Sequence, residues 1–279
     1  MLTYDKLVKS INSLPPLSNA ALQIQALYIN GAQNVEIIKL VRLIESDALL
    51  TANVLKMINS PYYGFSKKIA SVSQAVTLFG TELIHGIVIK YAINQKIKAN
   101  LKPYGISTRM FNDICHLQSA LMMQWYSKID LRDAQYLTPL ALIMETGKLI
   151  LSDEIIKSSY TLEFKNGFKK ADDILSYEYE LIDTTSYYVS ALLFEHWNLD
   201  SLYVEMLKGL DFKDDMLSSK MEYYISTLDV VRTAVNVREA FTKDSIDEAC
   251  EIVSGMNLDV DHFHNTAHRI KMMYIKKRQ

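Results

Sequence analysis

Apolar residues recur at helical spacing along almost the whole chain, and little in the sequence interrupts them. The 279 residues include only 9 glycines and 5 prolines, so long helices can run without breaks. Within residues 218–241, for example, Tyr224, Leu228 and Val231 fall near one helical face. No segment shows the apolar and polar alternation that is typical of a strand. The sequence therefore predicts an all-α protein.

Residues that commonly cap helix N-termini stand at the starts of the predicted helices. Asp130 is expected to begin a helix that continues through Leu151, and residues 245–248, Ser-Ile-Asp-Glu, have the pattern of a capping box. Pro61 prevents the preceding helix from continuing past Ser60. Gly80 is expected to end one helix before Thr81 begins the next. The other predicted helix starts are Asn19, Asn34, Asp47, Ser73, Ser107, Thr184, Asp200, Ser218 and Asp259.

Charge and cysteine content argue against several classes of protein. The formal net charge is −2 and no basic run is longer than the terminal Lys-Lys-Arg, so we expect no nucleic-acid partner. Cys115 and Cys250 lie far apart, which fits a reducing compartment. Charges interrupt the N-terminal residues, and no apolar run approaches the roughly 18 residues of a membrane-spanning helix. These features predict a cytoplasmic protein without a membrane segment.

Four segments, in order and spacing, resemble the HDOD family of bacterial signalling proteins, which are related to HD-type metal phosphohydrolases. The segments are LPPLSNAAL (14–22), residues 44–80 around NSPYYG, ALIMETGKLIL (141–151) and LLFEHWNLD (192–200). The resemblance extends over residues 10–210 and implies an HD-domain-like multi-helix bundle. The acidic stretch at 211–215 suggests a boundary, with an HDOD domain at 1–212 and a helical extension at 213–279 packed on it.

The resemblance also locates a former metal site. HD enzymes use a histidine from a first helix, a His-Asp pair from a second, and further histidines and an aspartate from later segments. By resemblance, His116 takes the first position, Met144 and Glu145 the pair, and Thr185 and Ser186 a later Asp-His. We call these five residues the predicted relic site. It is expected to hold no metal or cofactor and to contain no catalytic residue.

The chemistry of the five side chains supports that expectation. Activation of a water molecule for attack on phosphate needs a cation held by several ligands in fixed geometry. The thioether of Met144 is a soft donor unsuited to hard divalent ions, and hydroxyls are weak neutral ligands. His116 is interpreted as a hydrogen-bonded core histidine. Glu145 is interpreted as a solvated residue or as the partner of a lysine such as Lys148.

A second group of polar residues lies near the C-terminus. Asp261, His264 and His268 stand at i, i+3 and i+7, and the two histidines have the spacing of a two-histidine metal site. No third strong ligand is fixed by the sequence. We therefore favour a solvated polar helix face over a metal site.

The segment NSPYYGFSKK is the other conspicuous feature. It contains a helix end, a tyrosine corner and an exposed basic edge. Packing at an interhelical corner is the favoured interpretation, and a partner-docking surface is the alternative. The residues of that possible surface are Asn59, Ser60, Tyr62, Tyr63, Lys67 and Lys68.

The hypothesis that follows is a non-enzymatic bacterial signal-transduction or regulatory protein that binds one or more signalling partner proteins. Two alternatives stay open. The chain could sense a small ligand, a cyclic dinucleotide or guanosine phosphate, in the relic cleft. It could also retain metal-dependent phosphohydrolase activity through an unconventional ligand set.

Overall fold

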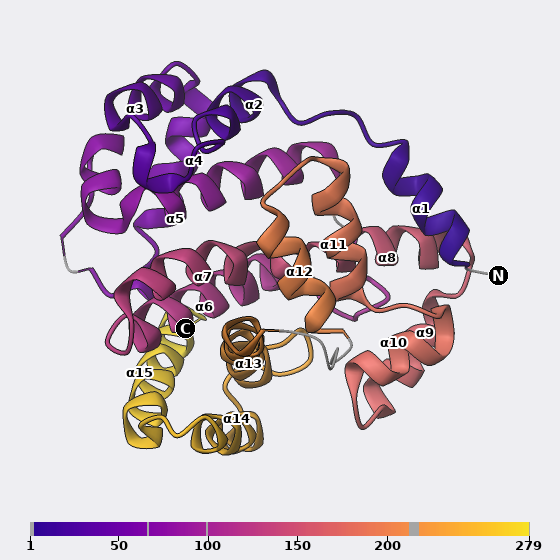
Figure 1. Cartoon of the computed structure of the whole chain (residues 1–279). Coiled ribbons are helices and arrows are strands. Elements are labelled where there is room, and N and C mark those ends of the chain that lie inside the picture. The colour runs from indigo at the N-terminus through magenta and orange to yellow at the C-terminus, as the bar shows by residue number, and fades with distance from the viewer. Residues whose placement is uncertain (1–2, 66, 99, 212–217, 279) are drawn as a thin grey trace.

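Helices account for the regular secondary structure of the described residues, which are 3–65, 67–98, 100–211 and 218–278 of a computed structural model. Within those ranges the only β-type pairing is one isolated antiparallel bridge between Val235 and Ala240. The predicted all-α class is confirmed. Figure 1 shows the arrangement of the helices.

The N-terminal third forms a lobe of short helices over one long helix. Helices α2, α3 and α4 gather at one end of α5, whereas α1 lies at the opposite side of the molecule and contacts α8 and α11 (Figure 1). The elements are α1 (Tyr4–Asn12), α2 (Asn19–Ala26), η1 (Ala32–Asn34), α3 (Ile37–Glu45), α4 (Ala48–Ile58), η2 (Pro61–Tyr63) and α5 (Val72–Lys96).

The central helices pack on α5 and on one another. Helix α7 contacts both α5 and α6, and α11 packs against α8, α12 and the short turn η3. The elements are α6 (Thr108–Tyr126), α7 (Leu131–Ile143), η3 (Met144–Thr146), α8 (Gly147–Lys157), α9 (Thr161–Lys170), α10 (Ile174–Ile182), α11 (Ser186–His196) and α12 (Ser201–Gly209).

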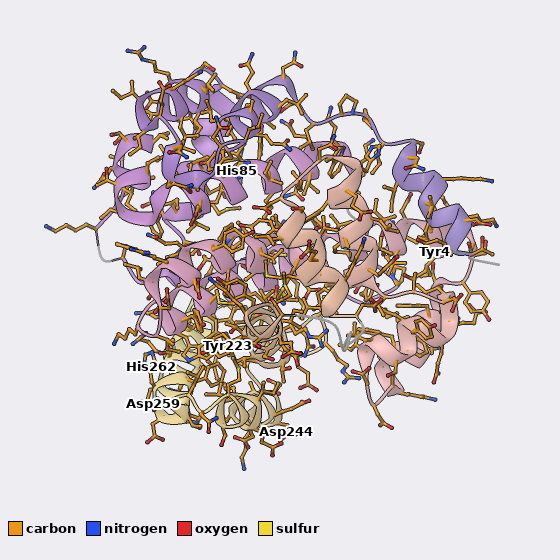
Figure 2. All side chains as sticks on the ribbon, in the orientation of Figure 1. Tyr4, His85, Tyr223, Asp244, Asp259 and His262 are labelled. Atoms are coloured by element: carbon orange, nitrogen blue, oxygen red, sulfur yellow. The ribbon has the colours of Figure 1, made fainter. Side chains whose placement is uncertain are left out.

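Three C-terminal helices complete the fold: α13 (Ser219–Ala234), α14 (Lys243–Gly255) and α15 (Val260–Arg278). Helix α13 contacts α6, α7 and α12, and α15 contacts α6 and η2. The apolar side chains of all three regions join one core, and Figure 2 shows side chains filling the space between the ribbons. The proposed boundary at 212/213 lies outside the described residues, so the division into two domains stays a prediction.

Several predicted N-caps are observed, whereas the N-caps of helices α2, α3, α5 and α11 are Ser18, Glu36, Ser71 and Thr185 instead of Asn19, Asn34, Ser73 and Thr184. Asp47 accepts hydrogen bonds from the amides of Leu49 and Leu50, as a capping aspartate does. The capping residue of α14 is Thr242 rather than Ser245. The Thr242 hydroxyl accepts a hydrogen bond of 3.1 Å from the amide of Ser245. The single helix predicted from Leu131 to Leu151 is wrong, because the 3-10 turn η3 separates α7 from α8.

Helix α5 is interrupted at Gly80, where the sequence predicts one helix to end and another to begin. Gly80 adopts φ 81° and ψ 165°, outside the helical region and open to glycine, so two helical segments meet at a kink within Val72–Lys96. With a mean hydropathy of 1.4 over 18 residues, α5 is apolar and long enough to cross a membrane, contrary to the sequence expectation. Of that window 56% is buried, and α3, α4 and α7 pack on the helix. A buried core helix can have the same length and hydropathy as a membrane-spanning helix.

Candidate functional site

The Met144-Glu145 pair lies in the turn η3 between α7 and α8, and both side chains are buried. Close approach of α11 fixes this turn. A Cβ at Gly147 would lie 1.9 Å from the carbonyl oxygen of Ser186, so only glycine fits there. The amide of Gly147 donates to Ser190 Oγ at 2.7 Å, and that hydroxyl donates to the carbonyl of Met144.

Glu145 forms a buried ion pair with Lys148, one turn along the chain. Their atoms Oε2 and Nζ are 2.7 Å apart. The other carboxylate oxygen accepts hydrogen bonds of 2.8 Å from Gln118 Nε2 and from the Tyr187 hydroxyl. Burial by itself would raise the pKa of Glu145, but the Lys148 charge and these hydrogen bonds outweigh it and lower the pKa. Glu145 is therefore held as an anion.

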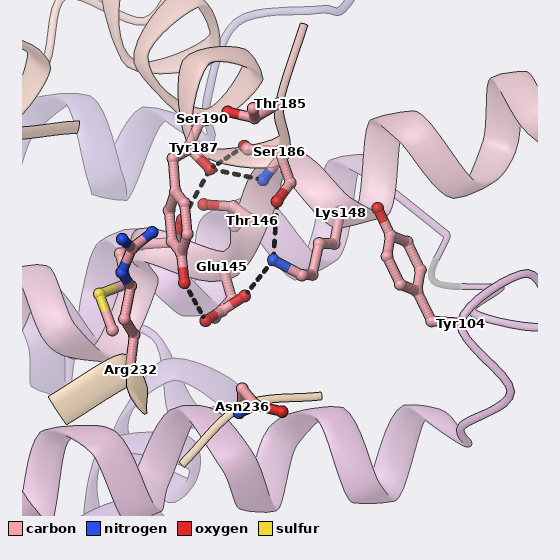
Figure 3. Close-up of polar contacts among 12 residues, drawn as sticks. Tyr104, Glu145, Thr146, Lys148, Thr185, Ser186, Tyr187, Ser190, Arg232 and Asn236 are labelled. Carbon is pink, nitrogen blue, oxygen red and sulfur yellow. Dashed lines mark hydrogen bonds and ion pairs between the residues drawn. The ribbon is translucent and has the colours of Figure 1, made fainter. Parts of the chain in front are cut away.

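The ammonium group of Lys148 has partners on several sides (Figure 3). Besides Glu145, it donates to Ser186 Oγ at 2.7 Å and lies 4.7 Å from the ring centre of Tyr187. A buried lysine needs such partners because an unpaired charge is costly in the core. The cation required by the Glu145 carboxylate is thus supplied by the chain itself.

A second buried carboxylate, that of Glu178, holds residues beside the Glu145–Lys148 ion pair in place. Glu178 is fully buried, accepts a hydrogen bond of 2.6 Å from the amide of Ser186, and accepts another of 2.9 Å from the Tyr104 hydroxyl. It therefore fixes the first turn of α11, where Ser186 faces Lys148. Thr185, the neighbouring residue, caps the same helix, because its hydroxyl accepts a hydrogen bond from the amide of Tyr188.

The C-terminal helices reach this cluster as well. The backbone carbonyl of Val235 accepts a 2.8 Å hydrogen bond from Gln118 Nε2, the same nitrogen that contacts Glu145. The Arg232 guanidinium lies 5.0 Å from the ring centre of Tyr187, on the face of the cluster toward α13 (Figure 3). The cluster is consequently closed by residues from both predicted domains.

His116 is not joined to Glu145 by these contacts. Gln118, two residues further along α6, points to the carboxylate in its place. Burial, and after it the charges of Lys90 and Lys277, lower the pKa of His116 to about 3. Asp113 opposes this shift only in part, and the imidazole is neutral near pH 7.

Of the five relic-site residues, the structure brings Met144, Glu145 and Ser186 together, with Thr185 beside them. Sequence reasoning named Lys148 only as one alternative partner of Glu145. It missed Gln118, Tyr187 and Glu178. Their signal in the sequence was weak, because each shares its helix with several other polar residues and nothing in the sequence singles it out.

Comparison with known proteins agrees with this architecture. The model of the HDOD domain matches residues 14–209. The chain belongs to the HDOD family. No curated protein matches the sequence.

Solved structures with similar folds include relatives at low sequence identity. A candidate phosphohydrolase from Shewanella amazonensis is 16% identical with a TM-score of 0.70, over 96% of this chain and 94% of that one. An HDOD domain protein from Geobacter sulfurreducens is 15% identical with a TM-score of 0.68, over 97% and 94%. A candidate signal transduction protein from Marinobacter aquaeolei is 20% identical with a TM-score of 0.67, over 98% and 63%. At these identities the likeness shows the fold.

The donor set of this HDOD protein does not fit a divalent metal ion at the relic site. The Glu145 carboxylate is bonded by an ammonium, an amide and a phenol, and Met144 contributes a neutral thioether. Hard divalent ions prefer several oxygen or imidazole donors. Among the described residues, no three His, Cys, Asp or Glu side chains are grouped closely enough to hold a metal.

The polar residues of α15 also lie apart from such a site. Asp261, His264 and His268 are exposed, and the two imidazole rings are 6.5 Å apart. A different histidine of this helix, His262, turns inward and bonds the carbonyl of Trp125 at 3.0 Å. The solvated polar face is the arrangement observed.

The predicted partner surface around NSPYYG is largely covered. Tyr62 and Tyr63 are 0% and 3% exposed, which agrees with the favoured interpretation of a packed interhelical corner. Helix α15 covers Tyr62: Lys277 Nζ lies 4.4 Å from the ring centre of Tyr62, and the Tyr274 ring lies 6.2 Å from it. Tyr63 instead packs on Phe79 of α5.

The remaining residues of that segment have mixed positions. Asn59 exchanges two hydrogen bonds with the backbone of Ile69 and is half-buried, as is Ser60. Lys67 and Lys68 are exposed. Packing of the corner explains Asn59 and both tyrosines, and a docking role for the two lysines stays a prediction.

Proposed function

We propose that this HDOD protein is a non-enzymatic regulatory component of bacterial signal transduction, located in the cytoplasm, that acts by binding a partner protein. One observation carries the proposal: the Lys148 ammonium occupies the place beside Glu145 where a catalytic cation would have to bind. The family and the signal-transduction relative of the same fold support the regulatory role.

The energetics of the cluster oppose catalysis at this place. A metal ion could approach Glu145 only after Lys148 had been displaced, which would leave a buried ammonium without its anion. Breaking a buried ion pair by loss of one partner costs about 3–5 kcal/mol. The ion pair and its hydrogen bonds thus stabilise a closed scaffold.

A phosphorylated ligand at the relic cleft has less support. Two cavities border the cluster: one of about 260 Å³ is lined by Lys148 and Tyr187, and one of about 470 Å³ is lined by Thr185. Their arginines are already bonded, Arg232 to Asp229 and Arg238 to backbone carbonyls. Carboxylates line both cavities, and they repel phosphate.

The lobe α2–α4 offers a surface for a partner. Ile38 and Leu49 are 70% and 67% exposed, and Ile29 is 80% exposed. Large apolar side chains grouped on a surface are typical of protein interfaces. Since α15 covers the NSPYYG corner, this lobe is the better docking surface in the structure described.

The test combines enzymology with partner capture. Untagged protein is analysed for bound metal and assayed for phosphohydrolase and phosphodiesterase turnover with manganese, magnesium, iron and zinc. We expect no turnover. Turnover that Glu145→Gln abolishes and Glu251→Gln leaves intact would overturn the non-enzymatic assignment.

Partner capture uses crosslinking in extracts of the native organism. We expect a specific partner to be lost with Ile38→Asp or Leu49→Asp. Leu162→Asp is the matched control, because Leu162 is 68% exposed on α9, outside that lobe. Equal loss with all three variants would refute docking at α2–α4.

A further inference from the structure

A cavity of about 470 Å³ lies apart from the Glu145 cluster, where the N-terminal lobe meets the central helices. Its walls come from four parts of the chain: α2 with η1, α5, α7, and the turn into α12. No residue of the Glu145 cluster lines it. The volume falls within the range of roughly 300–1,000 Å³ that is usual for small-molecule sites.

The charge of this cavity is negative. Its ionisable acids are Glu82 on α5 and Asp200 at the start of α12, and no lysine or arginine is among the lining residues. Burial, and after it the charge of Asp200, raises the pKa of Glu82. Both carboxylates line the same cavity, so each disfavours the negative charge of the other, and a bound cation would relieve that repulsion.

Polar atoms without partners also mark the cavity. Gln25 Oε1 and His85 Nε2 are buried atoms of lining residues, and each lacks a hydrogen-bond partner among the described residues. Buried polar groups in folded proteins are nearly always paired, so two in one cavity indicate a missing partner. Carbonyl and carboxylate oxygens only accept hydrogen bonds, which favours a ligand rich in N–H donors.

His85 is held in position to receive such a donor. Its ring stacks on Tyr28 with 4.0 Å between centres, and the Tyr28 hydroxyl donates to the carbonyl of Thr81 at 2.6 Å. Figure 2 labels His85 on α5, in the N-terminal lobe. Burial lowers its pKa to about 4, so the imidazole is neutral near pH 7 and does not repel a cation.

The walls are fixed by contacts between distant segments. Gln25 Nε2 donates to the carbonyls of Trp197 and Asn198 at 3.2 and 2.5 Å, which ties α2 to the turn before α12. The Tyr203 hydroxyl donates to the carbonyl of Tyr136 at 2.9 Å. Such preorganisation lowers the cost of ordering the site on binding.

The rest of the lining is apolar. Ile89, Pro139, Ile143 and Leu199 face the cavity, and a Cβ at Gly86 would lie 2.5 Å from that of Pro139, so α5 and α7 approach closely there. A ligand that fills this space needs a hydrocarbon portion as well as a charged head.

We propose that this cavity binds a small organic cation, an alkyl ammonium or guanidinium compound, with its charged head between Glu82 and Asp200 and its chain along Ile89 and Ile143. The head donates hydrogen bonds to both carboxylates, and a further N–H reaches His85 or Gln25. A bare metal ion fits less well, because Glu82, His85 and Asp200 are not grouped closely enough to coordinate one. The site is independent of the protein-binding role proposed above.

The test is calorimetric titration of the full chain with agmatine and with cadaverine at low ionic strength. Pentane-1,5-diol, which has a similar length and no charge, is the ligand control. The variants are Glu82→Gln and Asp200→Asn, each of which removes one negative charge. Asparagine caps a helix as well as aspartate does, so α12 keeps its N-cap. Glu251→Gln, an exposed position on α14, is the matched protein control.

We expect an amine to bind to the unaltered chain and to Glu251→Gln, with affinity reduced at least tenfold by Glu82→Gln and by Asp200→Asn, and no binding of the diol. Equal affinity in all four proteins, or no heat with either amine up to millimolar concentration, would overturn the proposal. Binding of manganese or zinc that depends on Glu82 and His85 and excludes the amines would overturn the organic-cation assignment.

Discussion

Lys148 Nζ lies 2.7 Å from Glu145 Oε2 although the two side chains are only 2% and 1% exposed. A buried charge pair of this kind is specific rather than strongly stabilising, since its Coulombic attraction is largely offset by desolvation. Its consequence for this HDOD protein is that the position beside the carboxylate is already occupied by a cation from the same turn.

Removal of one charge of the pair should therefore lower the stability of the fold far more than removal of both. We expect Lys148→Met to lower the free energy of unfolding by about 3–5 kcal/mol, because Glu145 would stay buried and unpaired. The double variant Lys148→Met/Glu145→Leu should recover most of that loss. Urea unfolding followed by circular dichroism measures both.

The exposed pair Lys208–Glu195 is the control for this experiment. Its side chains are 39% and 46% exposed at a separation of 2.5 Å. Lys208→Met should cost less than about 1 kcal/mol. A double variant of the buried pair that is as unstable as Lys148→Met alone would contradict the argument.

Close packing at Gly147 leads to a second prediction. A Cβ there would lie 1.9 Å from the Ser186 carbonyl oxygen and 2.6 Å from the Ser190 amide, both of them backbone atoms. Gly147→Ala should therefore force α8 away from α11 and lower stability by at least about 1–3 kcal/mol. A Cβ at Gly255 meets nothing within 4 Å, so Gly255→Ala should be neutral or stabilising by up to about 1 kcal/mol. Thermal melting distinguishes the two, and an unchanged melting temperature for Gly147→Ala would refute the packing argument.

A third prediction concerns acid sensitivity. The folded protein protonates His116 only near pH 3, whereas the unfolded chain does so near pH 6.5. Unfolding between these values takes up a proton, so stability must fall as the pH is lowered from about 6.5. Urea midpoints at pH 7 and pH 5 measure the fall.

The variant His116→Gln should make that fall smaller by about 2 kcal/mol, since each unit of pKa difference corresponds to about 1.4 kcal/mol. His264→Gln, at an exposed histidine, should leave it unchanged. The same pH dependence in both variants would show that other groups control the acid response.

Local and long-range features were not equally predictable from the sequence. The caps Asp47, Ser107, Asp130 and Asp200 were predicted correctly because a cap depends on a side chain and amides two or three residues away. The break at η3 was missed, since it is imposed by α11, whose Ser186 and Ser190 crowd Gly147 from about forty residues away.

The contacts of the candidate site show the same difference between local and long-range features. The pairing of Glu145 with Lys148 could be anticipated because the residues are one helical turn apart. Gln118 and Tyr187 could not, because 27 and 42 residues separate them from Glu145 and only the packing of α6 and α11 brings them together. The cover over Tyr62 likewise depends on α15, more than 200 residues further along the chain.

That cover leads to a final prediction about the C-terminal helix. Phe263 of α15 is fully buried and its ring centre lies 5.1 Å from that of Trp125 on α6, so it anchors the helix to the central bundle. Phe263→Ala should weaken this anchor by about 3–5 kcal/mol. Hydrogen exchange in residues 60–65 should then accelerate, because Tyr62 and its neighbours would lose the protection of Tyr274 and Lys277. Met272→Ala changes a residue of the same helix that is 53% exposed and should leave this exchange as it is. If residues 60–65 exchange at the same rate in both variants, α15 does not protect the corner, and the NSPYYG segment must be reconsidered as a docking surface.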